Sequence, residues 1–292
     1  MRSKLVVIML FAQINIVALS QDLIPKLPSK GAESSYVLPM RSLNMGFDEG
    51  TFEAILPAVF KGASPSKISG EIGTLDSFFN KLGRMHRGLV IDSVRVLHVG
   101  DSHIRGRFFT NALSERLTSV FPALKYEDYG INGATTRTFI KPDRIQKIAS
   151  FAPDLLILSF GTNESHNRGY NNIIHYSQMV QFISEIRKVL PYTPILLTTP
   201  PGSFERRARR AYRVNPRTSK AVETICLFAN DHHLPFWDVF SIVGGGEYAC
   251  NNWNQAKLMR PDRVHYLPEG YKLQADLFYE ALIRAYNEYV TY

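Results

Sequence analysis

The stretch R-V-L-H-V-G-D-S-H-I-R-G-R-F-F-T-N-A-L, residues 95–113, is the best guide to how the chain folds. A run of apolar and β-branched residues stops at Gly100, a compact polar cluster follows, and a pattern of helical period then begins. This order predicts a buried strand over 94–99, a tight corner, and a helix over 107–120. Ser102 lies at the corner, where a serine is either a helix N-cap or a nucleophile.

Strand and helix patterns alternate along the chain beyond this corner. Further short apolar runs predict buried strands at 155–160, 195–199 and 236–239, with a weaker candidate at 125–129. Helical patterns occupy 177–190, 219–232 and 270–289. The alternation predicts an α/β fold with a parallel sheet that helices cover on both faces. Ligands of such sheets gather at the carboxyl ends of the strands, so polar residues at those ends are the candidates for chemistry.

The first 74 residues differ from the remainder. Residues 1–20 contain two basic residues, then an apolar stretch with polar interruptions, then small residues just before Gln21. This order predicts a cleaved secretory signal peptide. The stretch is short for a membrane span, which needs ~20 apolar residues, although a retained anchor is the alternative. No other segment approaches that length. Residues 21–74 are rich in proline and predict an extended arm, partly packed on a main domain over 75–292, which opens with a short amphipathic helix pattern over 75–82.

Charge and cysteine content limit the possible partners. The formal charge is +8 for 292 residues, or +6 without the two basic residues of the signal, which suits acidic surroundings such as anionic sugars or a cell-envelope polymer. Ordinary solubility explains the charge equally well. An exported protein can form a disulfide between Cys226 and Cys250, and two packed free thiols are the alternative. With no second cysteine pair, their spacing does not indicate a zinc site.

Three more polar blocks follow the first. G-T-N-E, residues 161–164, places Asn163 just beyond a predicted strand, where its amide can donate to a developing oxyanion or simply form a turn. In Y-G-I-N-G-A-T, residues 129–135, Gly133 can bring a backbone N–H close to a reacting carbonyl. In R-P-D-R-V-H, Asp262 and His265 are separated by two residues. That spacing can place a carboxylate beside one imidazole nitrogen and leave the other free for a serine. The alternative is a local cap and a half-buried surface histidine.

The four blocks, in this order, resemble those of the SGNH or GDSL family of serine esterases and acylhydrolases over roughly residues 94–292. The resemblance implies a three-layer α/β/α sandwich with a flavodoxin-like parallel sheet. It also implies that Ser102 is the nucleophile and that His265 and Asp262 complete its triad. Gly133, Asn163 and the N–H of Ser102 match the oxyanion donors, and Asp101 matches the residue that supports the nucleophile loop. Such a mechanism requires no metal and no organic cofactor.

His103 departs from the family pattern, in which leucine is common at this place. The G-D-S-H form, together with Y-R-V-N-P and N-W-N-Q-A-K-L-M-R-P-D-R-V-H, is similar to exported esterases of gut and oral Bacteroidetes. That branch is associated with removing acetyl groups from carbohydrates or peptidoglycan. His103 itself either contacts substrate or makes a structural hydrogen bond.

Residues 205–217 contain six arginines shortly after a predicted strand. They form either a rim that binds substrate carboxylates, with Tyr212 and Arg213 as candidate contacts, or a solvated basic helix. Export and the lack of a recognisable nucleic-acid module argue against a nucleic-acid partner.

Together these features predict an exported serine esterase, periplasmic, at the outer surface or secreted, that removes O-acetyl groups from a glycan or from peptidoglycan. An O-acyltransferase would use the same triad to pass the acyl group to a sugar. A lipase or other acylhydrolase is disfavoured because no long apolar lid lies near the triad. A glycan-binding module on a disabled hydrolase fold is disfavoured because the triad is complete. The polymer and the oligomeric state stay open.

Overall fold

The computed structural model describes residues 46–89, 93–208 and 211–291. The predicted signal peptide and the first part of the predicted arm, to residue 45, lie outside this range. Among the described residues a six-stranded sheet has the order β1-β8-β5-β4-β2-β3. Its strands are β1 (Ser69–Gly70), β2 (Val94–Gly100), β3 (Leu124–Gly130), β4 (Leu155–Ser159), β5 (Ile195–Thr198) and β8 (Pro235–Trp237).

The sheet is parallel except at one edge. Strands β3, β2, β4, β5 and β8 pair in parallel, whereas β1 pairs antiparallel with β8. The order of the five parallel strands along the chain is that of flavodoxin, and it reverses between β2 and β4. The predicted α/β class with a flavodoxin-like sheet is therefore confirmed. The two-residue strand β1 is an addition that the apolar pattern did not predict.

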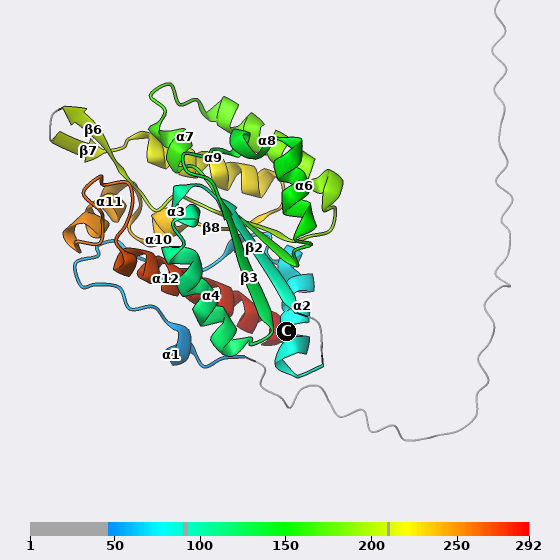
Figure 1. Ribbon diagram of the computed structural model, residues 1–292. Helices are drawn as coiled ribbons and strands as arrows, with labels where there is room; N and C mark the ends of the chain where they lie inside the picture. Colours follow the sequence, from blue (N-terminus) through cyan, green and yellow to red (C-terminus); the bar gives the residue numbers. More distant parts are fainter. Residues whose placement is uncertain (1–45, 90–92, 209–210, 292) are drawn as a thin grey trace, which may run out of the picture. The chain divides into compact units, whose positions relative to one another are not determined.

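Helices cover both faces of the sheet, as Figure 1 shows. One core contains the side chains of Leu155 and Ile157, and the other contains those of Leu156 and Leu158, because successive residues of a strand point to opposite faces. The first core is closed by α2 (Asp76–His86), α4 (Phe108–Val120) and α12 (Pro268–Thr291). The second is closed by α6 (Pro142–Ser150), α8 (Asn172–Val189) and α9 (Arg217–Asp231).

The segment before the sheet packs onto the first core. It contains α1 (Glu49–Phe52) and the short 3-10 helix η1 (Ile72–Leu75). Phe52 and Ile68 are buried in that core. The Ser66 hydroxyl donates to the carbonyl of Leu277 at 2.7 Å and accepts from the Trp237 indole at 3.0 Å. Residues 46–70 are therefore tied to both α12 and β8.

Three local expectations differ from the structure. The arginine-rich stretch forms a hairpin of β6 (Phe204–Ala208) and β7 (Ala211–Val214), so the helix alternative is wrong. Cys250, whose surroundings in the sequence predict a loop, lies in α11 (Gly245–Gln255). It and Cys226 are free thiols, and burial raises the pKa of each to about 12. The strand expected to end at Val239 ends at Trp237, and Val239 begins α10 (Val239–Ile242).

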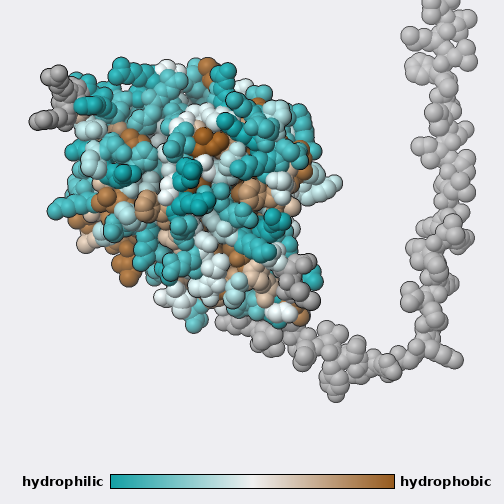
Figure 2. All heavy atoms as spheres, viewed as in Figure 1, coloured by the Kyte–Doolittle hydropathy of each residue, from teal (hydrophilic) through white to brown (hydrophobic). Residues whose placement is uncertain are grey.

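The surface in view is mostly hydrophilic, with apolar residues scattered over it (Figure 2). No helix in the part of the chain that the structure describes is both long enough and apolar enough to cross a membrane.

Candidate active site

At the corner after β2, the N-cap of the next helix is Asp101 and not Ser102. Ser102 is the first residue of α3 (Ser102–Arg105), and Asp101 is the N-cap. The Oδ1 atom of Asp101 accepts the backbone N–H of His103 at 2.9 Å. Since Asp101 caps the helix, the hydroxyl of Ser102 is available for other partners. Gly130 at the end of β3 makes the corner possible, because a Cβ there would lie 2.2 Å from the backbone nitrogen of Arg105.

The loop between α11 and α12 brings an imidazole to this hydroxyl. His265 Nε2 lies 2.9 Å from Ser102 Oγ, and His265 Nδ1 lies 3.0 Å from Asp262 Oδ2. The Oδ1 atom of Asp262 accepts the backbone N–H groups of Val264 and His265, each at 2.9 Å. The carboxylate next to Nδ1 favours the tautomer with its hydrogen there, which leaves the Nε2 lone pair facing the serine.

Asp262 is held as a carboxylate. Partial burial raises its pKa, but the hydrogen bonds from the backbone of His265 and Val264 and from the His265 ring outweigh this and leave the pKa below its usual value. The side chains of Asp262 and His265 are 47% and 30% exposed, so the pair is open to large substrates.

The loop that carries His265 is anchored to the protein interior by Tyr266. This side chain is fully buried, and its hydroxyl donates to the carbonyl of Gly202 at 2.6 Å. The backbone N–H of Arg260 donates to the carbonyl of His265 at 2.8 Å and closes the loop. The position of the imidazole thus depends on packed structure on both sides of it.

The predicted oxyanion donors lie on the two loops that follow β3 and β4. Asn163 is in α7 (Thr162–His166), and its Nδ2 donates to the carbonyl of Ala134 at 2.9 Å and to Asp101 Oδ2 at 3.1 Å. Both amide hydrogens are therefore engaged. Gly133 adopts a φ of +70°, a left-handed conformation that favours glycine. Among the described residues, the backbone N–H groups of Gly133 and Ser102 donate to no protein acceptor.

Asp101 connects the serine corner to Asn163. The side chain is buried, and burial raises its pKa from 3.8 to about 7, although the N–H of His103 opposes that shift. Nearby Glu164 raises the pKa further. Asp101 therefore accepts hydrogen bonds on both oxygens, from the backbone of His103 and from the side chain of Asn163.

His103 makes a structural hydrogen bond. Its Nδ1 lies 2.9 Å from the hydroxyl of Tyr271 in α12, and its ring centroid lies 5.1 Å from that of His265. Burial, with a smaller contribution from His265, lowers the pKa of His103 to about 3, so the ring is neutral. The structure does not test a contact with substrate. Tyr271, which lies five residues beyond Tyr266, was not singled out by the sequence pattern.

The hairpin of β6 and β7 adjoins the loop that carries the imidazole. The N–H of Phe204 donates to the carbonyl of Arg263 at 2.9 Å, and the Arg263 guanidinium lies 4.9 Å from the centroid of the Tyr212 ring. Arg213 forms an ion pair with Glu205 at 2.5 Å. Tyr212 thus contacts the loop that carries the imidazole, whereas Arg213 pairs within the hairpin. Substrate contact by either stays a prediction.

Within the described ranges, no group of three or more His, Cys, Asp or Glu side chains is arranged to hold a metal ion.

A serine hydroxyl, an imidazole and a carboxylate in series, at the carboxyl end of a mostly parallel sheet, define a site of the serine-hydrolase class. The sequence profile of the GDSL-like Lipase/Acylhydrolase family matches residues 98–273, and the chain belongs to that family. It is a carboxylic ester hydrolase of the GDSL/SGNH type.

Solved structures agree on the fold. A peptidoglycan O-acetylesterase aligns over 76% of this chain and 99% of its own, with a TM-score of 0.68 and 17% identity. A GDSL-like lipase from Bacteroides thetaiotaomicron VPI-5482 aligns over 72% of this chain and 99% of its own, with a TM-score of 0.51 and 20% identity. No curated protein sequence matches the chain.

Proposed function

We propose that this protein is an exported serine esterase that removes O-acetyl groups from a carbohydrate or from peptidoglycan. The contact that carries the proposal is the 2.9 Å distance from Ser102 Oγ to His265 Nε2, with Asp262 bonded to the other ring nitrogen. Export is supported by the signal-like composition of residues 1–20.

In the proposed mechanism, His265 takes the proton of Ser102 as the serine oxygen attacks the ester carbonyl. Asp262 stabilises the resulting imidazolium. The backbone N–H groups of Ser102 and Gly133 donate to the tetrahedral oxyanion, and Asn163 joins them by redirecting the N–H that otherwise faces Asp101. His265 then protonates the departing sugar hydroxyl. Water activated by the same imidazole releases acetate from the acyl-enzyme, which restores the free serine.

One feature favours a large substrate. The exposed position of His265 and Asp262 gives a polymer access to the serine. The peptidoglycan O-acetylesterase among the structural neighbours makes the same substrate class reasonable for this chain.

Hydrolysis of p-nitrophenyl acetate by the native protein and by Ser102→Ala tests the catalytic assignment. Loss of at least ~10³-fold in kcat is expected, because the serine forms the covalent intermediate. Equal rates would discard the assignment. Acetate release from O-acetylated peptidoglycan, acetylated xylan and O-acetylated sialic acid then identifies the polymer. A strong preference for p-nitrophenyl octanoate over the acetate would contradict the acetyl specificity.

A further inference from the structure

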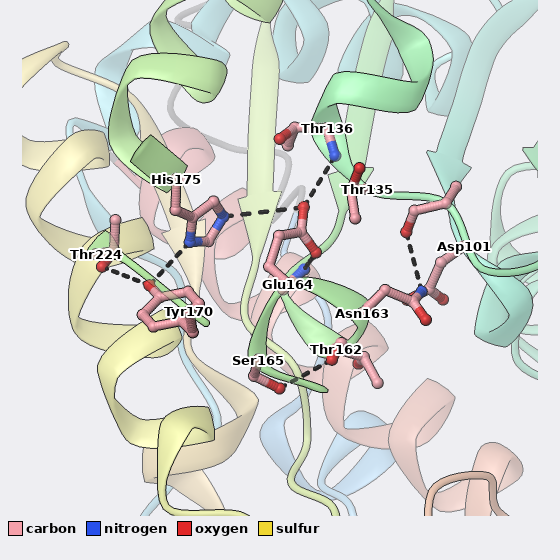
Figure 3. A network of polar contacts seen from close by, with 12 residues as sticks. Asp101, Thr135, Thr136, Thr162, Asn163, Glu164, Ser165, Tyr170, His175 and Thr224 are labelled. Carbon is pink, nitrogen blue, oxygen red and sulfur yellow. Dashed lines mark hydrogen bonds and ion pairs between the residues drawn. The ribbon is translucent and has the colours of Figure 1, made fainter. Parts of the chain in front are cut away.

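Glu164 is a buried carboxylate that contacts both loops of the candidate oxyanion site (Figure 3). Its Oε1 accepts the backbone N–H of Thr136 at 2.9 Å, and its Oε2 accepts the backbone N–H of Gly161, also at 2.9 Å. Each oxygen therefore has one backbone donor, and the two donors come from different loops.

Each loop contains one of the candidate donors. We call residues 131–135 and 161–163 the oxyanion loops; the second includes the first two residues of α7. Thr136, the first residue of α5 (Thr136–Phe139), follows Gly133 by three residues, and Gly161 precedes Asn163 by two. The carboxylate thus fixes the end of one loop to the beginning of the other. The bond from Asn163 Nδ2 to the carbonyl of Ala134 is a second link between the same loops.

The loops need such a link because the helices after them are short. Helix α5 has four residues and α7 has five, so neither makes enough hydrogen bonds of its own to be stable in isolation. An oxyanion site works only when its donors stand at a fixed spacing before the reaction begins. A displacement of about 1 Å between the loops would take one donor out of hydrogen-bond range.

A further layer of side chains supports the carboxylate from α8 and α9. His175 Nε2 lies 3.9 Å from Glu164 Oε1, and its Nδ1 lies 3.0 Å from the hydroxyl of Tyr170. That hydroxyl lies 2.9 Å from Thr224 Oγ1. Burial lowers the pKa of His175 to about 4, so the ring is neutral, and a hydrogen on Nε2 points its dipole toward the carboxylate. The chain of contacts joins the loops to the helical layer behind them.

We propose that Glu164 is a positioning residue, which sets the distance between the two oxyanion loops and so holds Gly133 and Asn163 ready for the transition state. This inference rests on the proposed function. Glu164 does not touch the substrate; it acts through the two backbone N–H groups that it accepts.

The test is Glu164→Gln, which keeps the shape of the side chain. A glutamine has one accepting oxygen, and its NH₂ group would face the N–H of either Thr136 or Gly161. With p-nitrophenyl acetate, kcat is expected to fall about 10- to 100-fold while KM changes less than about threefold, because the lost stabilisation belongs to the transition state. The pH profile of kcat should keep its shape, since His265 is untouched. Glu164→Asp, which restores the charge, should recover part of the rate.

Glu280→Gln is a matched control. Glu280 lies on α12, nine residues beyond Tyr271, and is also buried. It accepts the backbone N–H of Ala54 at 3.0 Å and pairs with Arg284 at 3.0 Å. Both variants should lower Tm, but only Glu164→Gln should lower kcat. Equal effects of the two variants on kcat, or no effect of either, would overturn the inference.

Two further measurements keep the outcomes separate. Loss of activity in Ser102→Ala with full kcat in Glu164→Gln would refute the positioning role and leave the proposed function in place. Full activity in Ser102→Ala would refute the proposed function itself. Should Glu164→Gln not fold, amide hydrogen exchange of the native protein decides. The N–H groups of Thr136 and Gly161 should then exchange as slowly as those of β4, and rapid exchange at both would contradict the link.

Discussion

At the scale of single residues, the G-D-S block shows how neighbouring side chains divide two roles that either could fill. Serine and aspartate are both good N-caps, so the sequence leaves Ser102 with two interpretations. In the structure, Asp101 accepts the N–H of His103 and caps α3. The hydroxyl of Ser102 lies next to His265 instead. Local propensity shows that either residue can be the N-cap. The position of His265, 163 residues away, then identifies Ser102 as the candidate nucleophile.

Burial of Asp101 predicts a pH dependence of stability. Its pKa is about 7 in the folded protein and near 4 when unfolded, so the folded state binds one more proton between these values. The free energy of unfolding therefore falls as pH rises from 4 to 7, by about 4 kcal/mol from this group. Urea denaturation at pH 4 and pH 8 measures it. Asp101→Asn cannot titrate and should show a smaller fall, while the buried histidines contribute equally to both proteins. Parallel pH curves for the two would contradict the assignment.

At the scale of elements, the sequence predicts those strands that are buried on both faces of the sheet. The interior strands β2, β4 and β5 are buried on both faces, and their apolar runs identify them. Strand β3 gives a weaker pattern because, at the sheet edge, all of its residues except Leu124 are partly or fully exposed. The pair of strands β6 and β7 is outside the main sheet and lacks an apolar pattern, so neither strand is visible in an arginine-rich run.

The hairpin predicts an electrostatic contribution to polymer binding. Arg206 is exposed and pairs across the hairpin with Tyr212, whose ring contacts Arg263 in the loop of the imidazole. Arg206→Glu should raise KM on O-acetylated peptidoglycan roughly two- to fivefold, since an exposed ion pair is worth up to about 1 kcal/mol. Added salt should shrink the difference. KM for p-nitrophenyl acetate should not change. Arg84→Glu, at an exposed position of α2, is the charge-matched control, and an equal effect from it would show that net charge alone acts.

At the scale of the whole molecule, the site is assembled from residues that lie up to 163 positions apart. The fold class could be predicted because strand–helix alternation and the direction of parallel strands decide which loops meet. The family resemblance gave the partners of Ser102. What the sequence could not supply are the contacts beneath the site: Tyr271 against His103, and Glu164 between the oxyanion loops. Such contacts depend on the distance between loops in the folded protein, and a local sequence pattern does not predict that distance.

The segment before the sheet gives a prediction for the fold as a whole. Residues 46–74 fall within the predicted arm, yet Phe52 is 1% exposed against α12, whereas Ile55, three residues later, is 89% exposed. If this segment completes the first core, Phe52→Ala should lower the free energy of unfolding by about 3–5 kcal/mol, because it removes a buried ring and leaves a cavity. Ile55→Ala should have almost no effect. Urea denaturation of both variants measures the difference, and kcat on p-nitrophenyl acetate should stay at the native value because the ring is remote from Ser102. Equal midpoints for the two variants would mean that the segment is dispensable and that the domain begins, as the sequence predicts, near residue 75.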